Sequence, residues 1–278
     1  PIRLRRPRRG VAESPRSFAH QEEFKFKRTA AKGRRLTLKA GKIHIQDEGR
    51  SDRQLPLALD EEAFGLTLLH HLGPKEGGAE IKKIQEIFTT FRVFDIDVRA
   101  ARQPAEARDR SRLRHDASNL AAFLAFLSDE HKRSFASLVA DARQMVPGLD
   151  DIQLRAVGGA SAAVTIDIAD HGRSGLTPLA DASFGTVRAL ALLAMLYDPS
   201  PPLLTCVEEI DHGLHPHVFD RLVDLLRTAS SRTQFLIATH SPALVNRLRP
   251  EELVVCERDP ATGLARIPAI SSDEVRAI

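Results

Sequence analysis

The chain has 278 residues, 42% of them hydrophobic and 28% charged, which is the composition of a globular protein with one large domain or two modest ones. Aromatic residues make up only 5%, with one Tyr and no Trp, and this scarcity argues against a stacking platform for single-stranded nucleic acid. The net charge of +3 is unevenly distributed, because residues 1–40 are strongly basic and the remainder is net acidic.

The N-terminal segment is rich in Arg, Pro and Ser and shows no helical or strand periodicity. We predict that residues 1–22 form a disordered basic arm. A solvated tail is the simpler interpretation, and contact with DNA or acidic lipid is the alternative. The opening PIRLRRPRRG lacks the apolar region of a secretory signal, and no stretch approaches the roughly 18 apolar residues of a membrane span. We therefore expect a cytoplasmic protein without a membrane span.

The next segment, residues 23–58, is expected to hold antiparallel strands. The stretches EFKFKR and KIHIQD each alternate apolar and polar residues, which is the pattern of a half-buried strand. With turn residues at Gly33 and Gly41, they predict two or three strands over residues 23–48.

Residues 59–148 are expected to be mainly helical. The apolar spacing predicts short helices over 61–74 and 81–91, with a strand candidate at 91–98. Two longer helices are expected between residues 117 and 148, where Pro147 and Gly148 end the pattern.

The pattern changes after residue 149. A strand is predicted at 162–170 and a buried helix at 184–198. Three short apolar runs then predict strands, and an amphipathic helix over 216–228 separates the first two of them; the runs are 202–207, 234–239 and 252–259. Strand, helix and strand at this spacing predict a parallel pair. Cys206 and Cys256 lie in these runs, so we expect buried thiols and no disulfide.

Polar residues follow two of these strands. Glu208 and Glu209 come directly after the first run, and Thr239 and His240 follow the second. In parallel sheets ligands bind at the carboxyl ends of strands, so neighbouring strands would bring Glu209 and His240 to one edge. A hydrated Mg²⁺ carrying a polyphosphate would neutralise the two carboxylates there. A solvated strand end with ordinary surface acids is the alternative.

Two further stretches carry candidate site residues. Ser183 and Gly185 open the helix at 184–198, where a hydroxyl, free N–H groups and the helix dipole favour phosphate, although Ser is also a common helix cap. His212, His215 and His217 are compatible with zinc, but no Cys lies at a metal-binding spacing. A loop leading into a helix is the preferred interpretation of the three histidines.

Three segments in a fixed order resemble the motifs of ABC-type ATPase heads. ASFGTVR resembles the signature motif, LLTCVEEIDHGLHP the Walker B motif running into the D-loop, and IATHSP the switch-histidine segment. The chain is most similar to the SMC, RecF and OLD-like group of AAA domains over roughly residues 90–270, where LRHDASNLAAFL and VVCERDPATG resemble the family's flanking segments.

The resemblance implies an α/β P-loop NTPase fold with the layered sheet of an ABC ATPase head. Residues 23–58 would then supply the antiparallel strands, 59–148 a helical insertion and 149–278 the ATPase core. It also implies ATP and Mg²⁺ as cofactors, ATP hydrolysis as the activity, and a nucleic-acid-related or defence process.

The family's roles carry over to the matching positions. Glu208 stands where an Asp usually holds Mg²⁺ through water, and it is one methylene longer. Glu209 matches the general base that polarises the attacking water, and His240 matches the residue that contacts the γ-phosphate.

Other roles belong to a head-to-tail homodimer. Asp211 falls in the D-loop, which communicates between the two subunits. Ser183 and Gly185 would bind the γ-phosphate of the nucleotide held by the opposite subunit.

The P-loop sequence G-x-x-x-x-G-K-[ST] does not occur in the chain. The single Gly-Lys pair, Gly41-Lys42, is followed by Ile43, and Leu36 stands where the first Gly belongs. We therefore expect the head to lack its first strand and P-loop. Two alternatives to an active ATPase stay open: a non-hydrolysing remnant that serves as a binding or structural module, and a nucleic-acid-binding module that acts through residues 1–40.

Overall fold

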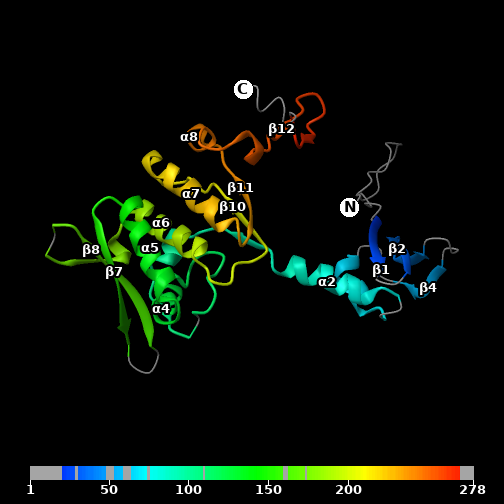
Figure 1. Ribbon diagram of the computed structural model, residues 1–278, viewed down its shortest axis with the longest axis horizontal. Helices are drawn as coiled ribbons and strands as arrows, with labels where there is room; N and C mark the ends of the chain where they lie inside the picture. The colour runs from blue at the N-terminus through cyan, green and yellow to red at the C-terminus, as the bar shows by residue number, and fades with distance from the viewer. Residues whose placement is uncertain are drawn as a thin grey trace, which may run out of the picture. The chain divides into compact units, whose positions relative to one another are not determined.

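The computed structural model of the chain describes residues 21–28, 31–47, 53–58, 64–73, 76–108, 110–158, 162–172 and 174–269. The chain divides into two compact units, Pro1–Thr90 and Phe91–Ile278, each with a hydrophobic core of its own (Figure 1). The arm predicted over residues 1–22 lies almost wholly outside the described residues. None of the described helices combines the length and the apolarity that crossing a membrane requires.

The first unit contains a four-stranded antiparallel sheet whose strands follow chain order: β1 (Gln21–Arg28), β2 (Ala31–Lys39), β3 (Lys42–Asp47) and β4 (Arg53–Ala58). The strands predicted from alternation are confirmed, and they bury the apolar side chains Phe24, Leu36, Leu38, Ile43 and Ile45. The fourth strand was not predicted because it contains Pro56. An edge strand tolerates Pro, since its outer edge needs no N–H donor.

Two helices cover the buried face of this sheet. The short helix expected over 61–74 forms in part, because the described residues of that range contain α1 (Gly65–Leu68) and, directly after it, a 3-10 turn (Leu69–His71). The longer helix α2 (Gly78–Thr89) begins where a Cβ on Gly78 would lie 1.8 Å from the carbonyl oxygen of Leu72. Only glycine fits there, so the chain can fold back sharply and place Ile81 in the core.

The second unit has a three-stranded parallel sheet in the order β11 (Gln234–Ala238), β10 (Leu204–Glu208), β5 (Arg92–Phe94). The predicted parallel pairing of the two strands that end in polar residues is confirmed. The strand expected over 91–98 is shorter than predicted. Asp97 accepts hydrogen bonds from the N–H groups of Arg99 and Ala100, and these bonds start the short helix α3 (Val98–Ala101).

Four longer helices supply most of the core of the second unit. They are α4 (Leu120–Glu130), α5 (Lys132–Met145), α6 (Phe184–Leu196) and α7 (Phe219–Ala229), and all were predicted with small shifts at their ends. In α6, ten residues in succession from Val187 are buried, because α3, α4, α5 and α7 all contact it. Figure 1 shows α7 beside β10 and β11, with α5 and α6 beyond it.

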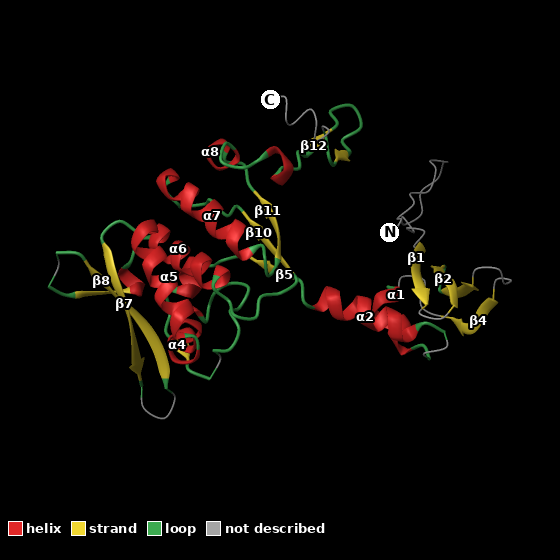
Figure 2. Ribbon diagram, in the orientation of Figure 1, coloured by secondary structure: helices red, strands yellow, loops and turns green. Residues whose placement is uncertain are grey.

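A second sheet of this unit packs on α4 and α5. It consists of β6 (Ala105–Glu106), β7 (Leu149–Val157), β8 (Ala163–Asp170) and β9 (Leu176–Pro178), and β7 and β8 form a long antiparallel hairpin (Figure 2). The strand β8 was predicted and β7 was not. A register shift between Leu149 and Asp151 puts Leu149 out of phase with Ile152 and Leu154, so the alternation of apolar residues covers only the later part of β7.

The last part of the described chain differs from the prediction. After β11 come α8 (Pro242–Val245) and a 3-10 turn (Pro250–Glu252), and of the strand expected over 252–259 only β12 (Glu257–Arg258) forms, paired with β13 (Ala265–Arg266). The preceding residues pair with no described strand, and Val254 is 65% exposed. Both cysteines are free, but buried thiols were expected at both: Cys206 is only half-buried, and the prediction is wrong for Cys256, which is exposed.

Candidate functional site

The two adjacent glutamates lie at the carboxyl edge of the parallel sheet. Glu208 ends β10 opposite Ala238, the last residue of β11, and the N–H of Glu209 donates to the carbonyl of Ala238 at 2.9 Å. The next residues of β11 are Thr239 and His240, so both polar ends leave the sheet at the same edge. The two strands are neighbours, as a shared site at their carboxyl ends requires.

The carboxylate of Glu209 faces solvent, not the core. Its side chain is 62% exposed, and one of its oxygens lies 3.1 Å from Nδ1 of His212. The N–H of His212 also donates to the carbonyl of Glu209 at 2.9 Å, which forms a tight turn after the strand. The carboxylates of Glu208 and Glu209 are therefore both exposed to solvent, and that of Glu209 also contacts the imidazole of His212. The carboxylate is free to take a further partner.

A buried arginine holds the backbone beneath these carboxylates. Arg188 of α6 is 6% exposed, and its guanidinium donates to the carbonyl of Glu209 at 2.8 Å and to that of Ile96 at 3.3 Å. Burial lowers the pKa of Arg188, while the nearby carboxylates, including Asp95 and Asp211, oppose the shift. The sequence analysis missed this residue. A single Arg inside the apolar stretch FGTVRALALLAML indicates a buried cation that needs acceptors, and this pattern could have identified the residue.

A hydroxyl links the loop after β10 to the residues after β11. Thr239 Oγ1 donates to Asp211 Oδ1 at 2.5 Å and accepts from the N–H of Ser241 at 3.0 Å. His240 lies between these two bonded residues and is exposed. The structure thus connects Asp211 to the backbone on both sides of His240.

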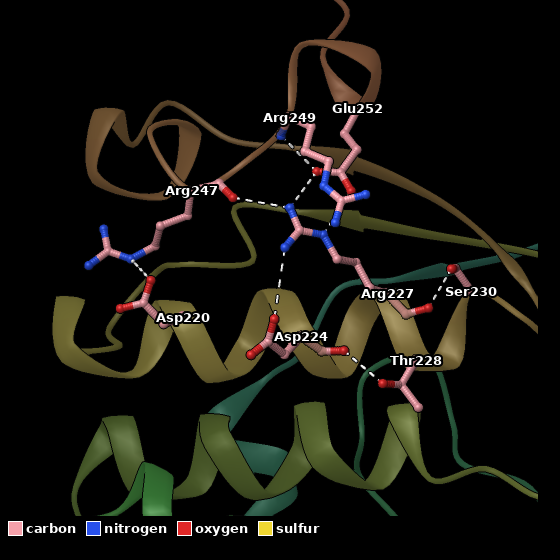
Figure 3. Close-up of polar contacts among 8 residues, drawn as sticks. All are labelled: Asp220, Asp224, Arg227, Thr228, Ser230, Arg247, Arg249 and Glu252. Atoms are coloured by element: carbon pink, nitrogen blue, oxygen red, sulfur yellow. Dashed lines mark hydrogen bonds and ion pairs between the residues drawn. The ribbon is translucent and has the colours of Figure 1, made fainter.

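Ion pairs attach the segment after His240 to α7 (Figure 3). Arg227 of α7 donates through two nitrogens to the carboxylate of Glu252, both at 2.8 Å, and Arg247 donates to Asp220 at 2.8 Å. The Arg227 guanidinium lowers the pKa of Glu252 to about 2. We call the Arg227–Glu252 pair the α7 clasp. With the Arg247–Asp220 pair, it fixes the path of the chain that leaves the site.

Ser183 and Gly185 lie at the start of α6. Ser183 caps the helix, because its Oγ accepts from the N–H of Thr186 at 3.1 Å. A Cβ on Gly185 would lie 2.7 Å from the carbonyl oxygen of Gly213, and a Cβ on Gly213 would meet the ring of Phe184 at 2.3 Å. The helix start and the loop after β10 therefore pack together at a distance that only glycine permits.

A cavity of about 430 Å³ opens beside this contact. Its lining includes Ser183, Gly185 and Thr186 of α6 and Gly213, His215 and His217 of the loop. The cavity thus places a hydroxyl, helix N–H groups and imidazoles around one space. These are donors of the kind that bind anionic groups.

The histidines do not assemble a metal centre. Nδ1 of His215 lies 2.7 Å from Nδ1 of His217, so one of these nitrogens donates to the other, and His212 contacts Glu209 instead. Among the residues that the structure describes, no group of three His, Cys, Asp or Glu side chains is placed to hold a metal ion. The carboxylate oxygens of Glu208 and Glu209 nevertheless suit Mg²⁺. That ion commonly takes one or two carboxylates together with substrate phosphates and water.

Solved structures to which the chain is similar include heads of SMC proteins. One is an SMC head bound to the C-terminal winged-helix domain of ScpA, at 13% identity over 86% of this chain and 69% of that chain, with a TM-score of 0.46. Another is the SMC head domain from Thermotoga maritima, at 13% identity over 92% of this chain and 76% of that chain, with a TM-score of 0.39. No curated protein matches the chain.

A family model matches residues 45–246 and is described as "AAA domain, putative AbiEii toxin, Type IV TA system". The match spans both candidate strand ends and the start of α6, and it covers more than half of the chain. The α/β class and the predicted resemblance to ABC- and SMC-like ATPase domains are confirmed. The chain belongs to this family of AAA ATPase domains.

Proposed function

We propose that the chain is an ATP-binding and ATP-hydrolysing head whose site lies at the carboxyl ends of β10 and β11. The observation that carries this proposal is the parallel pairing of these two strands, which brings Glu208 and Glu209 beside Thr239 and His240. Hydrolysis of a phosphoanhydride needs a cation, a base for water and a group that contacts the terminal phosphate. The site offers a candidate residue for each of these tasks.

In the proposed reaction Glu208 holds Mg²⁺, directly or through water, and the ion neutralises phosphate charge. Glu209 accepts hydrogen bonds from the attacking water and orients it, and the 62% exposure of its side chain leaves room for that water. His240 donates to the terminal phosphate. Arg188 keeps the backbone of Glu209 in place from below through the 2.8 Å bond to its carbonyl.

The proposed active form is a head-to-tail homodimer. Ser183 and Gly185 border a cavity at the start of α6, and Asp211 lies in the loop that packs near it and bonds to Thr239. In this proposal the cavity takes the terminal phosphate of a nucleotide held by the second copy. We place the protein in the cytoplasm, in a nucleic-acid-related or defence process, because the family description names a toxin of a toxin–antitoxin system.

A second candidate function is a binding or structural module that does not hydrolyse ATP. The observation in its favour is the lack of the sequence G-x-x-x-x-G-K-[ST], whose backbone amides and Lys grip the phosphates in P-loop proteins. In that case the carboxylates of β10 could act on ATP only together with a phosphate-binding loop that these 278 residues do not contain.

Mg²⁺-dependent ATP binding and turnover by the purified chain separate the two functions. We expect Glu209→Gln to retain ATP binding and to lower turnover by at least 100-fold, because the amide cannot act as a base. Glu257→Gln, a change to an exposed glutamate of β12, is the matched control and should leave turnover unchanged.

Equal turnover in the parent and in Glu209→Gln would remove Glu209 as the base. ATP binding without turnover in the parent would favour the non-hydrolysing module. Absence of both would overturn the proposal that these 278 residues by themselves bind and hydrolyse ATP.

A further inference from the structure

The outer face of the β1–β4 sheet carries cations in two rows. Residues that alternate with the buried core point outward, and the strand register aligns them. Lys25 lies opposite Arg35 in one row, and Lys39 lies opposite Lys42 in the other. The row between them contains Glu23, Thr37, His44 and Gln54. We call these rows together the basic sheet face.

Most acidic residues of the described strands lie on the opposite, inner side of the sheet. Glu22 is 3% exposed and accepts a hydrogen bond from the N–H of Gly65 at 2.9 Å on the inner side. Asp47 pairs with the buried Arg34, at 2.6 Å and 2.8 Å. Glu23 alone among these acids lies on the outer side, so the cations outnumber the carboxylates there by four to one.

The two cation pairs differ in how their charge is compensated. Glu23 lies 3.2 Å from Lys25 and 2.8 Å from Arg35, so one carboxylate bridges the first pair. Lys39 and Lys42 flank the two-residue turn at Ala40 and Gly41, both are exposed, and neither has an ion-pair partner among the described residues. Like charges directly opposite each other destabilise a sheet, and an external anion would remove that repulsion.

The composition of the face selects the kind of anion. Its described outward side chains include no Phe, Tyr, Trp, Leu, Ile or Val, and His44 carries the one ring among them, so the face is a poor surface for stacking on bases and offers no apolar group for insertion into a bilayer. It does offer Thr and Gln side chains, which commonly bond to phosphate oxygens. These features fit contacts with a nucleic-acid backbone that are independent of base sequence.

The spacing of the rows fits a duplex. Arg35 and Lys39 are four residues apart on β2, a distance of about 13 Å at the rise of a strand. The major groove of B-DNA is about 12 Å wide, so the two rows can meet the phosphate backbones on its two sides. We propose that the basic sheet face binds the phosphate backbone of duplex nucleic acid. This deepens the nucleic-acid part of the proposed function and does not depend on ATP turnover.

The test is the salt dependence of duplex binding by the full chain. The probe is a fluorescent 30-base-pair DNA of mixed sequence, measured by anisotropy without nucleotide between about 50 and 200 mM salt. For the double variant Lys39→Gln, Lys42→Gln we expect the slope of log affinity against log salt to become shallower by about 2, since each lost phosphate contact removes about 0.9. Lys39→Arg with Lys42→Arg should restore the parent slope.

Lys82→Gln with Lys83→Gln is the matched control. It removes the same charge from exposed positions of α2 in the same unit, and its slope should equal that of the parent. An equally shallow salt slope in both double Gln variants would mean that only the net charge of the chain matters, not the place of the lysines. A parent slope in Lys39→Gln, Lys42→Gln would assign binding to residues outside the face, and either result would overturn the proposal.

Two further outcomes complete the test. Binding to vesicles with 30% phosphatidylserine as tight as binding to DNA would identify a lipid surface as the partner and contradict the proposal. Failure of the parent to bind DNA would also overturn it, whatever the ATPase result. Loss of turnover in Glu209→Gln with intact DNA binding would leave this inference standing, so the two proposals fail separately.

Discussion

Glu209 has an unusual backbone conformation for its residue type, with a φ of 47°. A non-glycine residue in the left-handed region costs about 1 kcal/mol, and the surrounding contacts must offset that cost. The N–H of Glu209 donates to the carbonyl of Ala238 at 2.9 Å, and its carbonyl accepts from the guanidinium of Arg188 at 2.8 Å. The consequence is that the chain turns sharply at the end of β10 and presents the carboxylate to solvent at the sheet edge.

The close contact at the start of α6 leads to a prediction for Gly185→Ala. The added Cβ would lie 2.7 Å from the carbonyl oxygen of Gly213, so the backbone must shift. We expect a loss of about 1–3 kcal/mol in the free energy of unfolding, measured in urea. For the proposed homodimer we also expect weaker ATP-dependent association of the two copies, because the cavity beside Ser183 would change shape.

Gly175→Ala is the matched control, since a Cβ at Gly175 meets nothing within 4 Å. It should leave both stability and dimerisation unchanged. If Gly185→Ala proved as stable as Gly175→Ala, the loop after β10 would not be rigid against α6.

At the scale of elements, the α7 clasp ties one helix to the segment that follows the site. Arg227 and Glu252 are 32% and 31% exposed, so water weakens the pair but does not abolish it. The pKa of Glu252 falls from an ordinary value of 4.5 to about 2, which means that the folded state favours the charged carboxylate. The stabilisation is therefore fully present above about pH 4.5 and is lost as the pH falls toward 2.

This pH dependence predicts the behaviour of Glu252→Gln. The variant should be less stable than the parent by about 1 kcal/mol at pH 6, because a bidentate ion pair is replaced by a neutral contact. The difference should shrink as the pH is lowered to 3. Urea unfolding of both proteins at the two pH values measures it, with Glu257→Gln as a control at an exposed site. A difference that stays constant with pH would mean that the charge of Glu252 does not stabilise the segment.

At the scale of the whole molecule, the two cores predict two unfolding transitions. Ile81 belongs to the core of the first unit and Leu190 to that of the second, and both are 0% exposed. Ile81→Ala should destabilise the first unit by about 3 kcal/mol and leave the second transition in place, and Leu190→Ala should do the reverse. Calorimetry of the two variants measures this. A single transition that both substitutions shift equally would show that the units unfold as one.

Several elements and the candidate motifs were predictable because their patterns are local. The helical period of α4, α5 and α7 and the long apolar run of α6 can be read from a few turns of sequence, and the alternation in β1, β2 and β3 indicates a half-buried sheet face in the same way. The pairing of β10 with β11 followed from the strand–helix–strand spacing alone. The residues proposed for the site, including Glu209 and His240, could be named because each follows such a strand.

Other features depended on contacts between distant parts of the chain. Arg188 donates a hydrogen bond to the carbonyl of Ile96, 92 residues away in the chain, and no sequence periodicity predicts a contact at that separation. The register shift at the start of β7 kept that strand from being predicted, and the helix cap at Asp97 makes β5 shorter than predicted. Both features depend on individual hydrogen bonds to the backbone, which the sequence pattern does not indicate. The amino-acid sequence by itself predicted the four longer helices, the strands β1, β2, β3, β8, β10 and β11, and the polar residues that follow β10 and β11. Tertiary structure alone decided which buried groups support Glu209 and which cations share a sheet face, since those depend on packing between residues far apart in the chain.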